Sequence, residues 1–292
     1  MWVDLSEYGE PDLRNLSEMI SLHPTSVNNT LSSWQRPRLD VYGDYFFVTA
    51  TLPVAEPENY QVSASELDLF VDRNFLVSTH KRPLPFFEEV KERAQQSPKL
   101  VLQDAAFLLN IILDTLLEHY EELTERVEDQ IERMEERALK ETSDELLEEV
   151  LKLKRYTFAL NRLAEQHHAM LRAFLRPDFP FTAREEMEHY FRDLEERFQR
   201  LLAALSSAEG AVKGAFEIFI SHVSHRTNQV MRTLTIVSIL FLPPTLLVGF
   251  FGTNFVSSDP FLYQSVAFYV MMVAIVLTSI GNLFIFRRKG WL

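Results

Sequence analysis

The C-terminal part of the chain is almost continuously apolar, whereas the rest alternates between apolar and charged positions. Between Thr233 and Phe286 the sequence contains one charged residue, Asp259. Because a helix needs about 20 apolar residues to cross the hydrocarbon core of a bilayer, this stretch predicts two membrane-spanning helices. The expected segments are a stalk helix continuing into the first span over residues 182–251, a loop over 252–261, a second span over 262–286 and a basic tail over 287–292.

Residues 86–181 are predicted to form a helical subdomain, because apolar residues recur there every three or four positions. We expect a short helix from Phe86 to Gln96, a long helix from Gln103 to Lys140, and a third that begins near Thr142. The predicted buried positions are Leu109, Leu113, Leu116, Tyr120, Leu123, Val127, Ile131, Met134 and Ala138 in the second helix, and Leu146, Val150, Leu153, Thr157, Leu160, Ala164, His167, Leu171 and Phe174 in the third.

The stalk helix is predicted to be unusually long. No residue that ends a helix occurs between Thr182 and Pro243, and an apolar stripe begins at Phe191 and continues to Val212. At about 1.5 Å per residue, a helix reaching Phe251 would span roughly 100 Å. Such a helix is too long for a monomeric domain. Its length favours an oligomeric stalk that leads into a pore.

Residues 1–85 are predicted to form a small α/β domain. Asp12 to Leu22 has the pattern of a short amphipathic helix, and two stretches rich in β-branched and aromatic residues are typical of hairpins. The first hairpin, Arg38–Leu52, turns at Gly43, and the second, Leu67–Thr79, turns at Arg73. The fold class is therefore an α+β domain followed by very long helices and two C-terminal transmembrane helices.

One side of the helix that enters the first span is partly polar. Polar residues inside a span usually face protein or water rather than lipid. One helix cannot enclose a pore, so this side either lines a channel formed by several copies of the chain or packs against another helix. The stripe, which steps by three and four, consists of Glu217, Ile220, Ser224, Asn228, Met231, Thr235, Ser238, Leu242, Thr245 and Gly249.

Two prolines, Pro243 and Pro244, lie within the first predicted span. Because proline has no amide hydrogen, the carbonyls near Ile239 and Leu240 lose their usual helical partners. These oxygens either turn towards a pore axis and meet a cation, or are satisfied by Ser238 and its neighbours.

The charged residues predict the orientation of the chain in the membrane. Arg226 and Arg232 precede the first span, Arg287, Arg288 and Lys289 follow the second, and the loop at 252–261 has no Lys or Arg. By the positive-inside rule, both termini are expected in the cytoplasm. The N-terminal residues lack the basic flank and apolar run of a signal peptide.

Composition narrows the possible functions. The formal net charge of −13 argues against nucleic acid as a partner and suits cations, and the chain has no cysteine for a disulfide or a thiolate metal site. No phosphate-binding loop and no set of nucleophile, base and acid is visible, so we expect neither an enzyme nor a cofactor. A divalent cation moving inward gains about 4.6 kcal/mol at 100 mV, which can drive uptake without ATP.

Neutral amides suit a hydrated cation. Mg²⁺ holds its water tightly, and the side chains of Asn228 and Asn254 can accept hydrogen bonds from that water without displacing it. His222 and His225, one turn apart on the stalk helix, either share a metal or pack on the stalk. Acidic residues between Glu121 and Glu135 are expected to form a solvated face, which could also attract cations.

At these C-terminal residues the chain resembles the CorA family of divalent metal cation transporters, including its ZntB-like members. The matching segments are Thr227–Ile236, Phe241–Thr245, Gly249–Phe255 and the basic tail that ends in Trp291 and Leu292. The resemblance implies a homopentamer in the cell (inner) membrane, with a cytoplasmic funnel and a central pore lined by the first span.

The same resemblance implies roles for individual residues. Gly252, Thr253 and Asn254 would form the outer selectivity loop, and Asn228 would lie at the cytoplasmic mouth of the pore. The expected hydrophobic gate consists of Met231, Leu234 and Leu242, and the further pore-lining residues are Thr235, Ser238, Gly249 and Thr245, the last as a polar ring. The resemblance also implies a basic collar of Arg287, Arg288 and Lys289, and two regulatory metal ligands, Glu217 and Asp193.

Two departures from the family pattern leave the transported ion open. Thr253 stands where the usual signature has Met, as a variable residue does in zinc-handling relatives, and the outer loop has a single acid, Asp259. Three functions therefore remain: a Mg²⁺/Co²⁺ transporter driven by membrane potential and gated by cytoplasmic metal, a ZntB-like Zn²⁺ transporter with or without proton coupling, and a membrane-anchored sensor or scaffold that does not transport.

Overall fold

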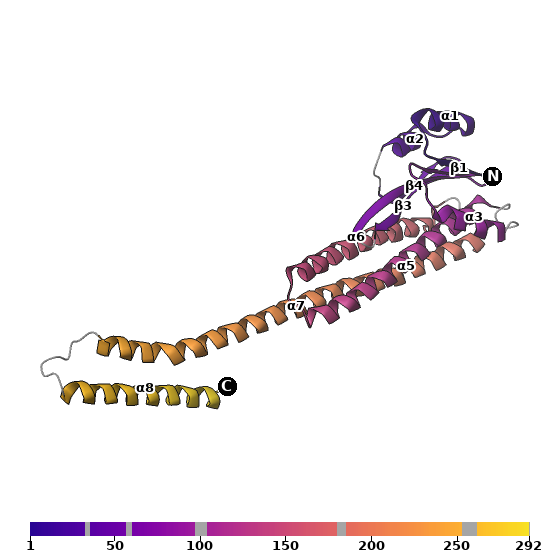
Figure 1. Cartoon of the computed structure of the whole chain (residues 1–292). Coiled ribbons are helices and arrows are strands. Elements are labelled where there is room, and N and C mark those ends of the chain that lie inside the picture. The colour runs from indigo at the N-terminus through magenta and orange to yellow at the C-terminus, as the bar shows by residue number, and fades with distance from the viewer. Residues whose placement is uncertain (33–35, 57–59, 97–103, 180–184, 253–261, 292) are drawn as a thin grey trace. The chain divides into compact units, whose positions relative to one another are not determined.

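The computed structural model describes residues 1–32, 36–56, 60–96, 104–179, 185–252 and 262–291 (Figure 1). These residues form two compact units, Met1–Phe219 and Ile220–Leu292. The long helix α7 (Glu185–Gly252) contributes its first part to the first unit and its last part to the second.

The first unit contains a five-stranded sheet with the strand order β1-β5-β4-β3-β2. Both predicted hairpins are confirmed, since the antiparallel strands β2 and β3 and the antiparallel strands β4 and β5 pair with each other. The strands are β1 (Trp2–Ser6), β2 (Arg38–Tyr42), β3 (Tyr45–Glu56), β4 (Gln61–Val71) and β5 (Leu76–His80). The parallel pairing of β1 with β5 was not predicted, because it joins a short N-terminal segment to a strand far along the chain.

Two short helices, α1 (Glu10–Ile20) and α2 (Pro24–Leu31), cover one face of this sheet. Their Leu13 and Val27 pack with Phe47, Phe70 and Val77 from the strands in one buried cluster. The sequence predicted α1 within two residues but missed α2. Pro24 stands at the first position of α2, where a missing amide hydrogen costs nothing.

The opposite face of the sheet contacts the helices α5 (Ala105–Ala138) and α6 (Asp144–Phe174). His167 of α6 is fully buried, and its Nε2 accepts a hydrogen bond of 3.0 Å from the Thr51 amide of β3. Nδ1 therefore carries the ring proton and donates to the Leu163 carbonyl at 2.9 Å. Burial lowers the pKa of His167 to about 4, so this histidine is a neutral structural bridge between sheet and helix.

The helical predictions are confirmed in the described residues. The helix α3 (Phe86–Gln96) has the predicted bounds, and Asp104 and Ser143 cap α5 and α6 through side-chain hydrogen bonds. The residues named above as the buried stripes of the second and third helices are all buried, as are Phe191, Leu194, Phe198, Leu201, Leu205, Ala208 and Val212 of α7.

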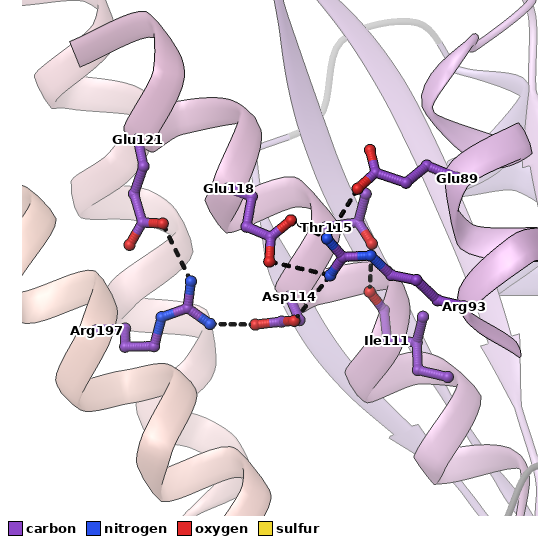
Figure 2. A network of polar contacts seen from close by, with 8 residues as sticks. All are labelled: Glu89, Arg93, Ile111, Asp114, Thr115, Glu118, Glu121 and Arg197. Atoms are coloured by element: carbon purple, nitrogen blue, oxygen red, sulfur yellow. Dashed lines mark hydrogen bonds and ion pairs between the residues drawn. The ribbon is translucent and has the colours of Figure 1, made fainter. Parts of the chain in front are cut away.

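A network of ion pairs joins α3, α5 and α7 within the first unit (Figure 2). Arg93 of α3 contacts Asp114 of α5 at 3.1 Å and also Glu118. Arg197 of α7 contacts the same Asp114 and, at 3.0 Å, Glu121. Because Asp114 is shared by both arginines, the network joins α7 to α5 at Arg197 and α5 to α3 at Arg93. Glu121 is therefore part of this network, whereas Glu122, Glu125, Glu128 and Glu132 form the exposed face that the sequence predicted.

Candidate functional site

The second unit consists of the end of α7 and the helix α8 (Leu262–Arg288). Both helices contain segments that are long and apolar enough to cross a membrane, and these segments are not buried. They coincide with the two predicted spans, so the apolar surfaces of this unit suit lipid or further copies of the chain.

The predicted pore stripe is largely open in the single chain. Asn228, Met231, Leu242, Thr245 and Gly249 are exposed. Leu234, which the resemblance added to the gate, is also exposed, and Thr235 and Ser238 are half-buried.

A different stripe of α7 is the more covered one. Ile236, Leu240, Pro243 and Leu247 are half-buried and recur at steps of three and four. At about 3.6 residues per turn, this stripe lies roughly 140° around the helix from the polar stripe. The polar stripe therefore remains available to a pore axis or to another copy of the chain.

The carbonyl released by Pro243 has a partner that the sequence analysis did not identify. Asn282 Nδ2 of α8 donates a hydrogen bond of 3.2 Å to the Ile239 oxygen. Within the single chain, this oxygen is therefore bonded to a side chain of α8. The available signal was the single Asn of the mainly apolar second span, since an amide in a membrane is costly unless it bonds to protein.

The end of α8 folds back towards α7. Arg232 donates to the Gly290 carbonyl, and its guanidinium lies 5.9 Å from the centre of the Trp291 ring. Trp291 stacks on Phe286 at 5.8 Å, and Gly290 has a φ of 67°, a left-handed conformation that favours glycine. The predicted collar residues Arg287, Arg288 and Lys289 are all exposed beside this turn.

The predicted regulatory ligands are not brought together within one chain. Glu217 and Asp193 are both exposed, and the described residues contain no group of three or more carboxylate or histidine side chains that could hold a metal. His222 is half-buried, with no hydrogen-bond partner for its Nδ1 among the described residues, and His225 is exposed. A metal bound at Glu217 or Asp193 would therefore need ligands from another copy of the chain or from water.

The outer loop is described only at its first residue. Gly252 is the last residue of α7, and Thr253 and Asn254 lie outside the described residues.

Comparisons with known proteins place this arrangement among membrane transporters. A family model described as CorA-like Mg²⁺ transporter protein matches residues 1–288. The cobalt/magnesium transport protein CorA of Thermotoga maritima is 24% identical over 293 residues, which cover 100% of this chain and 83% of that protein. The putative metal ion transporter YfjQ of Bacillus subtilis is 28% identical, covering 99% of this chain and 89% of that protein.

The fold also matches a solved structure of a full-length protein. The complete structure of the CorA magnesium transporter from Methanocaldococcus jannaschii aligns with a TM-score of 0.86 at 23% identity, covering 100% of this chain and 91% of that one. This likeness confirms the predicted fold class, an α+β domain followed by long helices and two C-terminal apolar helices.

Proposed function

Because the chain belongs to the CorA-like Mg²⁺ transporter family, we propose that it carries Mg²⁺ and Co²⁺ into the cell through a pore formed by several copies of α7. Its family consists of membrane transporters rather than enzymes. The observation that carries the proposal is the polar stripe of α7, which stays open on a helix whose other sides are apolar. The cobalt and magnesium named for the Thermotoga maritima relative support this choice of ions.

In the proposed assembly, five copies surround the axis, as the family resemblance implies. The amide of Asn254, held beside Gly252 and Thr253, meets the hydrated cation at the outer mouth, and Asn228 meets it at the cytoplasmic mouth. Met231, Leu234 and Leu242 form hydrophobic constrictions between these amide rings, which close a pore by excluding water.

The remaining roles follow from charge and position. Both termini lie in the cytoplasm of a cell whose inner membrane holds the protein, and the membrane potential drives inward flux. The exposed tail residues Arg287, Arg288 and Lys289 form a collar around the cytoplasmic mouth. Cytoplasmic cations bound at Glu217 and Asp193 stabilise a closed arrangement of the subunits.

Flux into liposomes tests this function. We expect the purified protein to admit Mg²⁺ and Co²⁺ when the interior is negative, because a divalent cation gains about 4.6 kcal/mol at 100 mV. We expect the rate to be the same with and without a pH gradient. The measurement is uptake of Mg²⁺, Co²⁺ and Zn²⁺ by ion-sensitive dyes, with protein-free liposomes as the control.

The same experiment distinguishes the alternatives. Uptake of Zn²⁺ alone, accelerated by a pH gradient, would replace the proposed function by a ZntB-like one, which the Thr253 departure from the family signature favours. No flux of any of the three ions by correctly assembled protein would leave the sensor or scaffold function.

A further inference from the structure

Gly290 and Trp291 end α8 in a defined turn. The Gly290 amide donates to the Arg287 carbonyl at 3.2 Å, and the next amide, that of Trp291, donates to the Phe286 carbonyl at 2.9 Å. With Gly290 in the left-handed conformation, these two bonds form a Schellman motif. The residue after the glycine of this motif often makes an apolar contact with the helix, and Trp291 makes it by stacking on Phe286. The positions of the Gly290 carbonyl and the Trp291 ring are therefore set by α8 itself.

Phe286 anchors this turn. Its side chain is only 4% exposed, whereas the other apolar side chains described for α8 are half-buried or exposed. The stacked rings of Phe286 and Trp291 thus form a small packed end on a helix that otherwise buries little within the single chain.

The turn meets α7 at Arg232. The Arg232 guanidinium donates to the Gly290 carbonyl, and its central carbon lies 5.9 Å from the centre of the Trp291 ring. A cation over an aromatic face is attracted by the ring quadrupole, and tryptophan is the strongest such partner. None of the ion pairs among the described residues includes Arg232. In the part of the chain that the structure describes, this charge is therefore held by Gly290 and Trp291.

The position of Arg232 on α7 gives this contact a consequence. Arg232 lies one turn after Asn228, the proposed amide of the cytoplasmic mouth. At about 3.6 residues per turn, it lies roughly 40° around the helix from Asn228, between the polar stripe and the covered stripe of α7. A long arginine side chain at this point can extend towards α8 or towards the polar stripe. In the structure it extends towards α8.

We propose that Gly290 and Trp291 hold the charge of Arg232 at the end of α8, beside the basic collar and away from the polar stripe at Asn228. Trp291 is then a positioning residue for the cation path, and it acts through Arg232. This inference rests on the proposed function, because it requires the polar stripe to carry cations. A released Arg232 would bring a positive charge next to Asn228 in every copy of the chain, and a divalent cation feels this repulsion twice as strongly as a monovalent one.

The test measures how fast charged thiol reagents react at residue 228 of the full chain in detergent. The chain has no cysteine, so Asn228→Cys introduces the only thiol, one turn from Arg232. The ratio of its reaction rates with a cationic and an anionic methanethiosulfonate reports the local charge without any need for flux. We expect Trp291→Leu, which keeps an apolar contact for Phe286 but removes the aromatic face under the guanidinium, to lower this ratio about 3- to 10-fold.

Three comparisons make this result specific to the released charge. In an Arg232→Gln background, Trp291→Leu should leave the ratio unchanged, because no charge remains to be released. Trp291→Phe, which keeps an aromatic face, should lower the ratio less than Trp291→Leu does. A thiol at the exposed Ser221, roughly 16 Å along the helix from Arg232, should respond much less, because charges are screened beyond about 10 Å at 0.1 M salt.

Thermal unfolding of each variant checks that it folds. If Trp291→Leu fails to fold, Gly290→Ala decides the question, because it keeps the ring and disfavours only the left-handed turn that presents it. An unchanged ratio in the folded variant, or an equal fall of the ratio in the Arg232→Gln background, would overturn the proposal.

Flux measures the effect on transport. With the cysteine-free chain in liposomes, Trp291→Leu should lower Mg²⁺ uptake, and adding Arg232→Gln should restore it. A purely structural role of Trp291 predicts no recovery, because removing Arg232 also removes its contact with α8.

This inference and the proposed function can fail separately. A chain that transports no ion, but whose rate ratio falls with Trp291→Leu, would retain the placement of Arg232 and lose the pore. A chain that transports Mg²⁺ with an unchanged ratio would retain the pore and lose this inference.

Discussion

Replacing Asn254 by alanine is expected to reduce divalent-cation uptake to background, by about 100-fold or more. In the proposed pore every copy of the chain loses its amide at once. A hydrogen bond is worth about 1 kcal/mol, so five copies lose about 5 kcal/mol, which corresponds to a factor of more than 10³ in binding at the outer mouth. The measurement is Mg²⁺ uptake into liposomes at a fixed membrane potential.

The control for Asn254→Ala is Ser257→Ala in the same outer loop, which leaves the Gly252, Thr253 and Asn254 signature intact. Size-exclusion chromatography must show the same assembly for both variants. Uptake by assembled Asn254→Ala at more than about a tenth of the wild-type rate would contradict a selectivity role for this amide.

Replacing Asn282 by leucine is expected to lower the free energy of unfolding by about 1–3 kcal/mol per chain, the cost of a carbonyl left unpaired where water cannot reach it. In the wild type the Asn282 amide donates to the Ile239 oxygen, which Pro243 leaves without a helical donor. The variant leaves that oxygen unpaired in the apolar interior of the membrane, where water cannot replace the lost donor. Thermal unfolding in detergent measures the loss of stability. Flux into liposomes, measured separately, shows whether the variant still transports.

The second site of a double-mutant cycle is Pro243. Pro243→Ala restores a backbone amide four residues after Ile239, which can donate to the same carbonyl. We therefore expect Asn282→Leu to cost much less stability in a Pro243→Ala background than in the wild type. Equal costs in the two backgrounds would show that Asn282 does not act through the Ile239 carbonyl.

Regular patterns in the sequence predicted the parts of the fold that local physics determines. The stripes on α5, α6 and α7 follow from helical spacing, and both hairpins follow from β-rich segments around short turns. The strand β1 could not be predicted this way, because its five residues are organised by their parallel pairing with β5. The helix α2 was missed because Pro24 was interpreted as the end of one helix rather than the start of another.

The candidate site also has one part that local patterns predicted and another that depends on residues distant in the sequence. Helical spacing predicted a polar stripe on α7, and the structure leaves most of it exposed. The donor to the Ile239 carbonyl could not be predicted from spacing, because Asn282 lies on the other helix of the unit. Whether the stripe surrounds an axis is a property of the assembled copies, which no pattern in a single chain determines.

Cysteine accessibility tests the central claim, that the polar stripe of α7 faces an aqueous pore, most directly. The chain has no cysteine, so a single substitution introduces the only thiol. Ser238 lies on the stripe, and its neighbour Val237 lies about 100° away around the helix. We predict that a charged, membrane-impermeant thiol reagent blocks flux through Ser238→Cys and leaves Val237→Cys unaffected. Block of Val237→Cys with no effect on Ser238→Cys would contradict the account.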